Sequence, residues 1–360
     1  MSKRTKKPKK SNLKKKLLKL EFLLYLIIVA AFFGMLTWLA GRQYESAHPV
    51  TGQVSVDTPN PTDYKQLNLH LAAKAYYSNT PIRKNRAITA TSEYQNIIFD
   101  FSVPKDNLTE HGLMALPAKA PPSGGYPVII LCHGYNNPWS YSTYKAYLGD
   151  MDFYASKGFA VLKPDFRGQG LSIADGSPDG AYYSMSYNTD VMSLIAAVKR
   201  TPYLDKDNIN LWGHSMGAYI ALRAAVLYPS IKNVILLSGP VGTVQDMYSA
   251  YTAISDRLNP TASAIKGDEL AQFGTPYSNP AFWNNTSPLN FLKNSKAHFQ
   301  IHVGTDDEIV PPEFSAELDS ALTKAHKDHE YYVYPGAGHG LVAQRSLIWS
   351  RSLAALGKTD

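Results

Sequence analysis

The chain has 360 residues, of which 44% are hydrophobic and 18% are charged. This balance predicts two domains or one large domain with extensions, and it excludes a chain that is disordered throughout. The single cysteine, Cys132, excludes a disulfide framework or a cysteine-based zinc site within one chain. The net charge of +7 arises in residues 1–21, which carry ten Lys or Arg and one acid. The remainder is close to neutral, so no nucleic-acid partner is expected.

Residues 22–40, which follow this basic tail, contain no charged side chain. As a helix they would extend roughly 28 Å, close to the ~30 Å thickness of the hydrocarbon core of a membrane. We therefore expect a cytoplasmic tail, 1–21, and a transmembrane signal-anchor, 22–40, of a single-pass cell-membrane protein whose catalytic domain is extracytoplasmic. A cleaved signal peptide is the alternative, although its apolar region is usually shorter, at about 7–15 residues.

Residues 41–95 read as an extracytoplasmic linker and N-terminal extension, and from 96 to 360 short apolar runs alternate with helical patterns. This alternation predicts an α/β fold with a mostly parallel sheet covered by helices on both faces. Residues 243–295 interrupt it and are expected to form a small cap. The expected strands are 96–102, 112–116, 128–132, 159–163, 209–212, 234–237, 299–303 and 331–334. The expected helices are 141–157, 185–200, 216–227, 312–326 and 341–356.

A glycine-bracketed serine follows the fifth of these strands, in the sequence GHSMG from 213 to 217. The pattern G-x-S-x-G between a strand and a helix is typical of a sharp, strained turn that exposes a nucleophilic hydroxyl. An ordinary N-capping serine would explain the helix start but neither flanking glycine. We therefore interpret Ser215 as the nucleophile. The side chain of His214, its neighbour, should point elsewhere, since adjacent side chains diverge at the turn.

A serine hydroxyl needs a base, and the base needs a carboxylate that orients it. Of the ten histidines, His339 is the best candidate, because it lies between glycines after the last expected strand. The segment GTDDE, which follows another strand, offers three competing acids: Asp306, Asp307 and Glu308.

Two backbone N–H groups are expected to bind the oxyanion of the tetrahedral intermediate: that of Met216, directly after the nucleophile, and that of Tyr135, in the loop after strand 128–132. Cys132 is interpreted as a buried strand residue rather than a reactive thiol. For Asp165 we expect a role in a turn together with Arg167.

The ordered segments HGY, DFRGQGLS, GHSMGA, GTDDEIVP and GAGHG resemble the α/β-hydrolase superfamily over residues 97–356. The stretches YPVIILCHGY, YASKGFAVLKPDFRGQG and LDKDNINLWGHSMGAYIAL resemble the catalytic domain of the prolyl oligopeptidase (S9) branch and related acyl esterases. The resemblance selects Asp307 as the acid, because the family's G-x-x-D-x-x-V pattern fits Gly304, Asp307 and Val310. Two features depart from the peptidases. Only residues 41–95 lie between the expected membrane segment and the hydrolase, too few for a β-propeller, and the Arg-Gly-Gln-Gly turn is similar to that of general esterases.

Together, these features predict a serine hydrolase that cleaves an ester or a peptide bond through an acyl-enzyme, with Ser215, His339 and Asp307 as its triad. Its partner would be a small acyl ester or peptide substrate, and neither a metal nor a cofactor is expected. A carboxylesterase for short acyl or aryl esters is the alternative within the enzymes. A non-catalytic binding module on the same fold is the alternative from another class.

Overall fold

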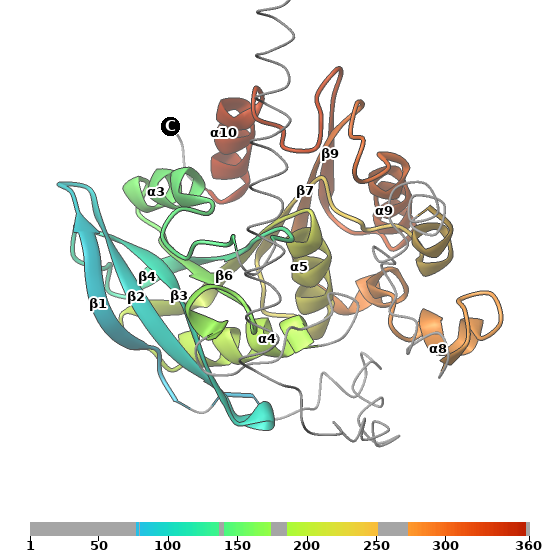
Figure 1. Ribbon diagram of the computed structural model, residues 1–360. Coiled ribbons are helices and arrows are strands. Elements are labelled where there is room, and N and C mark those ends of the chain that lie inside the picture. The colour runs from blue at the N-terminus through green and yellow to red at the C-terminus, as the bar shows by residue number, and fades with distance from the viewer. Residues whose placement is uncertain (1–76, 79, 137–139, 174–185, 251–272, 358–360) are drawn as a thin grey trace, which may run out of the picture. The chain divides into compact units, whose positions relative to one another are not determined.

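The computed structural model describes residues 77–78, 80–136, 140–173, 186–250 and 273–357, all of which belong to one compact unit of the chain (Figure 1). The strands in it are β1 (Arg83–Ala90), β2 (Tyr94–Val103), β3 (Leu108–Pro117), β4 (Tyr126–Cys132), β5 (Ala160–Pro164), β6 (Leu204–His214), β7 (Asn233–Leu237), β8 (His298–Gly304) and β9 (His329–Tyr334). The α-helices are α3 (Leu148–Ser156), α4 (Ser186–Val198), α5 (Met216–Leu227), α8 (Pro280–Asn284), α9 (Glu313–Lys324) and α10 (Arg345–Ala355).

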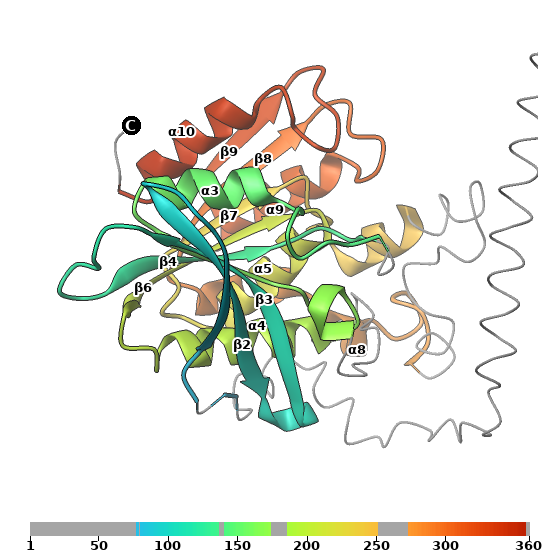
Figure 2. The same cartoon turned by 60° about the vertical axis from the view of Figure 1, so that its left-hand side comes forward.

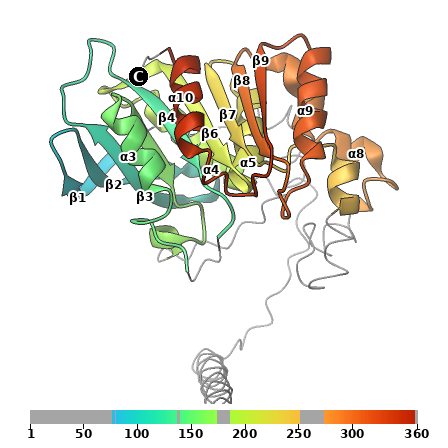
Figure 3. The same cartoon turned by 90° about the horizontal axis from the view of Figure 1, so that it is seen from above.

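The described strands form one nine-stranded sheet in the order β1-β2-β3-β5-β4-β6-β7-β8-β9. The pairs from β5 to β9 are all parallel, whereas β1, β2 and β3 join the sheet antiparallel. Figure 3 shows β1 to β3 at one end of the sheet and β8 and β9 at the other. The predicted mostly parallel sheet is therefore confirmed. Because the carboxyl ends of the parallel strands share one edge, the loops that follow them come together there.

Helices cover both faces of the sheet, and the alternation of side chains along each strand explains why (Figure 2). In β4, Val128, Ile130 and Cys132 pack in one apolar cluster with α4, α5 and α9. Ile129 and Leu131 of the same strand point to the opposite face, where they belong to the cluster that includes α3 and α10. Strands buried on both faces need continuous apolar runs, which is what the sequence of the parallel strands contains.

All eight predicted strands and all five predicted helices are present; α5 has the predicted bounds, and the bounds of the others differ. Helix α3 begins at Leu148 rather than at residue 141, and α10 begins at Arg345 rather than at 341. Tyr147, just before α3, and Leu341, four residues before α10, have φ angles of 57° and 49°, which no right-handed helix contains. Strand β1 was not predicted, and it lies within the stretch assigned to the N-terminal extension.

Several predicted segments lie outside the described residues: the basic tail 1–21, the signal-anchor 22–40, most of the extension and the centre of the cap. At the two ends of the cap region, residues 244–250 are helical, and 273–295 contain α8 and a 3-10 helix, η5 (Pro288–Asn294). Within the part of the chain that the structure describes, no helix is both long enough and apolar enough to cross a membrane.

Candidate active site

Ser215 occupies the turn between β6, which ends at His214, and α5, which begins at Met216. Its φ of 55° and ψ of −126° place a non-glycine residue in a rarely populated, strained conformation. The turn fits because residue 217 is glycine: a Cβ there would collide with the backbone carbonyls of Cys132 and His133. The Ser215 N–H also donates to the Leu237 carbonyl at the end of β7, at 2.9 Å. The predicted strand–serine–helix elbow is thus present.

His339 and Asp307, which lie in the loops after β9 and β8, are held together by hydrogen bonds. Nδ1 of the imidazole lies 3.0 Å from Oδ1 and 2.9 Å from Oδ2 of the carboxylate. Oδ1 also accepts the backbone N–H groups of Ile309, at 3.0 Å, and Val310, at 2.9 Å. Burial by itself raises the pKa of Asp307, but the bonds from His339 and the two amides outweigh it and lower the pKa below its ordinary value. The acid is therefore ionised at neutral pH.

Among the described residues, the imidazole has no hydrogen bond or ion pair with either of the two competing acids. Asp306 is exposed, and its Oδ1 accepts the Thr305 hydroxyl at 2.8 Å. Glu308 is exposed as well. Of the three acids that the sequence offered, only Asp307 is buried against His339, in agreement with the G-x-x-D-x-x-V spacing.

The loop of His339 also contacts the serine elbow. The Nε2 of His214 lies 3.1 Å from the His339 carbonyl oxygen, and the centroids of the two rings are 4.9 Å apart. The hydrogen bonds of the described residues do not include one between the Ser215 hydroxyl and the His339 ring. Catalytic bonds of this kind are often long in the absence of substrate and tighten in the complex. As expected, the His214 side chain is turned to partners of its own.

The two proposed oxyanion donors are available. Neither the Met216 nor the Tyr135 backbone N–H donates a hydrogen bond within the described residues. Met216 stands at the first position of α5, where the helix dipole favours a negative charge. Tyr135 follows β4 and exposes 65% of its surface. Both amides could therefore bind a developing oxyanion without first losing an internal partner.

Cys132 is buried at the end of β4, and burial raises its pKa well above the ordinary thiol value. It is a packing residue, as predicted.

Asp165 has the expected role in the turn, where its carboxylate accepts the Leu171 N–H at 3.0 Å, but Arg167 is not its partner. The Arg167 guanidinium forms ion pairs with Asp190 and with Asp106, the latter at 2.7 Å. Asp165 is buried and instead accepts hydrogen bonds from neighbouring loops, from the hydroxyls of Tyr141 and Thr143 and the N–H of Leu171.

Sequence reasoning also missed Lys163, a fully buried lysine in β5. Its Nζ donates to the Tyr141 hydroxyl at 3.1 Å and to the Thr143 carbonyl at 2.9 Å. Burial lowers the pKa of Lys163 to about 8, partly opposed by the charge of Asp165. Only its place within an apolar run hinted at burial.

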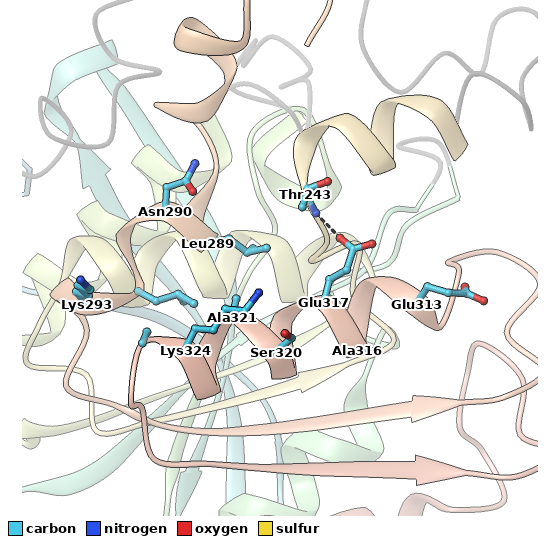
Figure 4. A pocket seen from close by; sticks show the side chains of 12 residues that line it. Thr243, Leu289, Asn290, Lys293, Glu313, Ala316, Glu317, Ser320, Ala321 and Lys324 are labelled. Carbon is cyan, nitrogen blue, oxygen red and sulfur yellow. Dashed lines mark hydrogen bonds between the residues drawn. The ribbon is translucent and has the colours of Figure 1, made fainter. Parts of the chain in front are cut away.

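A separate open pocket of about 930 Å³ lies along α9, between that helix and η5 (Figure 4). Its lining is mixed, with Lys293, Lys324 and Glu313 around apolar side chains, and the Thr243 N–H donates to the Glu317 carboxylate at 2.6 Å. None of the five candidate site residues lines it.

The fold and the site define the class: an α/β-hydrolase with a serine on its nucleophile elbow. The model of the prolyl oligopeptidase family matches residues 145–356, more than half of the chain, and the protein belongs to this family.

Two curated relatives of the chain are named as peptidases. The uncharacterized peptidase YuxL of Bacillus subtilis is 24% identical over 249 residues, which is 66% of this chain and 34% of YuxL. A probable dipeptidyl-aminopeptidase B of Emericella nidulans is 24% identical over 264 residues, or 70% of this chain and 26% of that protein. The chain thus spans about a third of the length of the first relative and about a quarter of that of the second.

Two solved structures share the fold. Acetyl xylan esterase 1 of Thermoanaerobacterium sp. has a TM-score of 0.56 at 19% identity, covering 81% of this chain and 94% of the esterase. The acylaminoacyl peptidase of Pyrococcus horikoshii has a TM-score of 0.56 at 18% identity, covering 73% of this chain and 41% of the peptidase.

Proposed function

We propose that Ser215, His339 and Asp307 form the catalytic triad of this hydrolase, which cleaves an ester or a peptide bond through an acyl-enzyme. The observation that carries the proposal is the buried Asp307 carboxylate bonded to His339 Nδ1, in a loop that contacts the strained Ser215 elbow. Because Asp307 holds the proton on Nδ1, the Nε2 of His339 is left with a lone pair and can act as a base.

In the first half of the reaction, the Ser215 hydroxyl attacks the acyl carbonyl while His339 Nε2 takes its proton. The resulting oxyanion accepts hydrogen bonds from the Met216 and Tyr135 N–H groups. His339 then protonates the leaving alcohol or amine, and the acyl group remains on Ser215. In the second half, His339 deprotonates a water molecule that attacks this ester, and the acid product leaves.

Labelling with a fluorophosphonate tests the proposal, since such probes react covalently with an activated serine. We expect the full-length protein to be labelled at Ser215 and the Ser215→Ala variant to remain unlabelled. His339→Gln should also prevent labelling, because the serine then lacks its base. An unlabelled but correctly folded wild-type protein would support a non-catalytic binding module instead.

The nature of the scissile bond is the second part of the proposal. The curated relatives are named as peptidases, which favours a peptide or amide substrate. The carboxylesterase alternative is supported by the acetyl xylan esterase, whose structure this fold matches over 94% of its length. Paired kcat/KM values on aminoacyl amides and on short-chain acyl esters would distinguish the two, and an amide preference would favour the peptidase.

We also propose that residues 22–40 anchor the enzyme in the cell membrane with its catalytic domain extracytoplasmic, on the basis of their uncharged length and the basic tail before them. Protease added to intact cells should then degrade the catalytic domain and spare the tail. Full protection in sealed cells, lost on lysis, would contradict this topology. A soluble product beginning after residue 40 would favour signal cleavage.

A further inference from the structure

A chain of three hydrogen bonds connects the loop after β4 with the loop that carries His339. The Gly134 N–H donates to the Tyr147 hydroxyl oxygen at 3.0 Å. That hydroxyl lies 2.7 Å from Nδ1 of His214, and Nε2 of His214 lies 3.1 Å from the His339 carbonyl oxygen. We call this chain the Tyr147–His214 relay.

The chemistry of its two ends fixes the direction of the two outer bonds, and the protonation state of His214 fixes that of the middle one. The His339 carbonyl oxygen can only accept, so Nε2 of His214 carries the proton. The Gly134 amide can only donate, so the Tyr147 oxygen accepts from it. If His214 is neutral, its Nδ1 has a lone pair and must receive the Tyr147 hydroxyl proton. Removal of water from around the ring lowers the pKa of His214 to about 4, which keeps it neutral at pH 7.

The relay adjoins three parts of the proposed machinery: the oxyanion loop, the nucleophile and the base loop. Gly134 immediately precedes Tyr135, which offers an oxyanion donor, and His214 immediately precedes Ser215. A Cβ at residue 134 would approach the Tyr147 hydroxyl to 2.8 Å, and both His214 Nδ1 and the Ser215 Cβ to 3.2 Å. The oxyanion loop is therefore packed tightly on the relay and on the nucleophile. The next residue of the base loop, Gly340, is held by Arg345, whose Nη2 donates to the Gly340 carbonyl at 2.9 Å.

We propose that Tyr147 and His214 are positioning residues, which hold the oxyanion loop at Gly134 and the base loop at His339 in register with Ser215. The inference rests on the proposed function. Neither side chain needs to touch the substrate: each acts through backbone atoms of residues that do. Loss of the relay should affect the transition state more than the ground state, since oxyanion donors reach their full strength only when charge develops.

The test is Tyr147→Phe in the full-length protein, because this change removes one hydroxyl and keeps the ring that packs edge-on against Trp212. We expect kcat on a chromogenic ester to fall on the order of 10- to 100-fold, the range for misplaced catalytic groups, with KM changed less than about twofold. Hydrogen exchange of peptides that contain Gly134 should become faster, since this amide loses its acceptor. His214→Gln, which retains a donor toward His339 but offers Tyr147 no ring nitrogen, should lower kcat similarly.

The chain contains a matched control in Tyr334→Phe. The Tyr334 hydroxyl lies 2.8 Å from Nδ1 of His302, whose Nε2 lies 2.9 Å from Gln300 Oε1. The change therefore removes the same type of bond to a buried histidine in β8 but leaves the relay intact. We expect this variant to retain wild-type kcat and wild-type exchange at Gly134.

Two outcomes would overturn the inference, and they differ from each other. A wild-type kcat for Tyr147→Phe in an enzyme labelled at Ser215, or an equal loss in Tyr334→Phe, would show that the relay positions nothing. A wild-type protein that neither hydrolyses the ester nor reacts with the fluorophosphonate would remove the proposed function and, with it, the role of the relay.

Discussion

Replacing Asp307 by Asn changes one oxygen of the site to an NH2 group and leaves its size almost unchanged. In the structure, Oδ1 accepts the backbone N–H groups of Ile309 and Val310, while both carboxylate oxygens face His339 Nδ1. The asparagine oxygen should therefore take the Oδ1 place, where the two amides converge. Its NH2 group then takes the Oδ2 place, 2.9 Å from His339 Nδ1.

This arrangement reverses the tautomer of the imidazole. An NH2 group can only donate, so His339 Nδ1 must accept and its proton must move to Nε2. The nitrogen that faces the nucleophile then has no lone pair for the Ser215 proton. In a serine protease the corresponding change lowers kcat about 10⁴-fold, or about 5.4 kcal/mol at ~1.36 kcal/mol per tenfold. Because Asp306 and Glu308 are exposed rather than directed at His339, we expect them to replace little of this loss.

Asp306→Asn is the matched control, since it makes the same chemical change one residue earlier. The Asp306 carboxylate lies at the surface and accepts only the Thr305 hydroxyl among the hydrogen bonds of the described residues. We expect kcat within about twofold of wild type. The assay is kcat on one chromogenic ester for both variants, with circular dichroism to confirm folding. Equal losses, or a loss confined to the 306 variant, would refute the assignment of Asp307.

Three further predictions concern stability. In Gly217→Ala, the new Cβ would collide with the Cys132 carbonyl. We expect this change to lower Tm on the order of 5 °C, as measured by calorimetry, and to abolish fluorophosphonate labelling of Ser215. We expect Lys163→Met to be more stable than wild type, with a difference in unfolding free energy that shrinks as the pH rises from 8 to 10, by up to about 1.4 kcal/mol per pH unit. In this range the unfolded lysine still binds a proton that the folded lysine, with a pKa of about 8, has lost, so wild type gains stability with pH. A difference that stays constant with pH in urea titrations would contradict this prediction. Burial lowers the pKa of His302 to about 3, so the unfolded chain binds a proton there that the folded protein does not. The free energy of unfolding should therefore fall as the pH falls from about 6.5 towards 4, by up to about 1.4 kcal/mol per pH unit. His302→Gln should make this pH dependence weaker.

The sequence predicted those elements whose burial it encodes directly. Strands β4, β5 and β7 are buried on both faces and carry uninterrupted apolar runs, so they were found within about two residues at each end. Strand β1 is an edge strand that pairs with β2 alone, and its sequence RKNRAITA is mostly exposed. No apolar pattern marks such a strand, because tertiary pairing rather than burial makes it extended.

The sequence predicted those site residues whose chemistry depends on the conformation of the local backbone. Glycines marked the elbow of Ser215 and the loop of His339, because both turns need residues without a Cβ. Asp307 could be separated from Asp306 only through the family spacing, since adjacent acids on one turn look alike in sequence. The structure separates them by burial and by partner: the Asp307 carboxylate is buried against His339, and that of Asp306 is exposed to solvent.

The relay could not be predicted from the sequence, for a different reason. His214 is half-buried and His302 is buried. In each of them, Nδ1 faces a tyrosine hydroxyl and Nε2 faces an acceptor oxygen. The same logic of donors and acceptors fixes the tautomer of both, yet only His214 has partners in the two loops of the proposed site. Its tyrosine is 67 residues away in the chain and lies just before α3, in a segment whose pattern predicted an ordinary helix. Local reasoning could place the His214 ring away from the substrate, but its partners are set by how the loops after β4 and β9 and the segment before α3 come together.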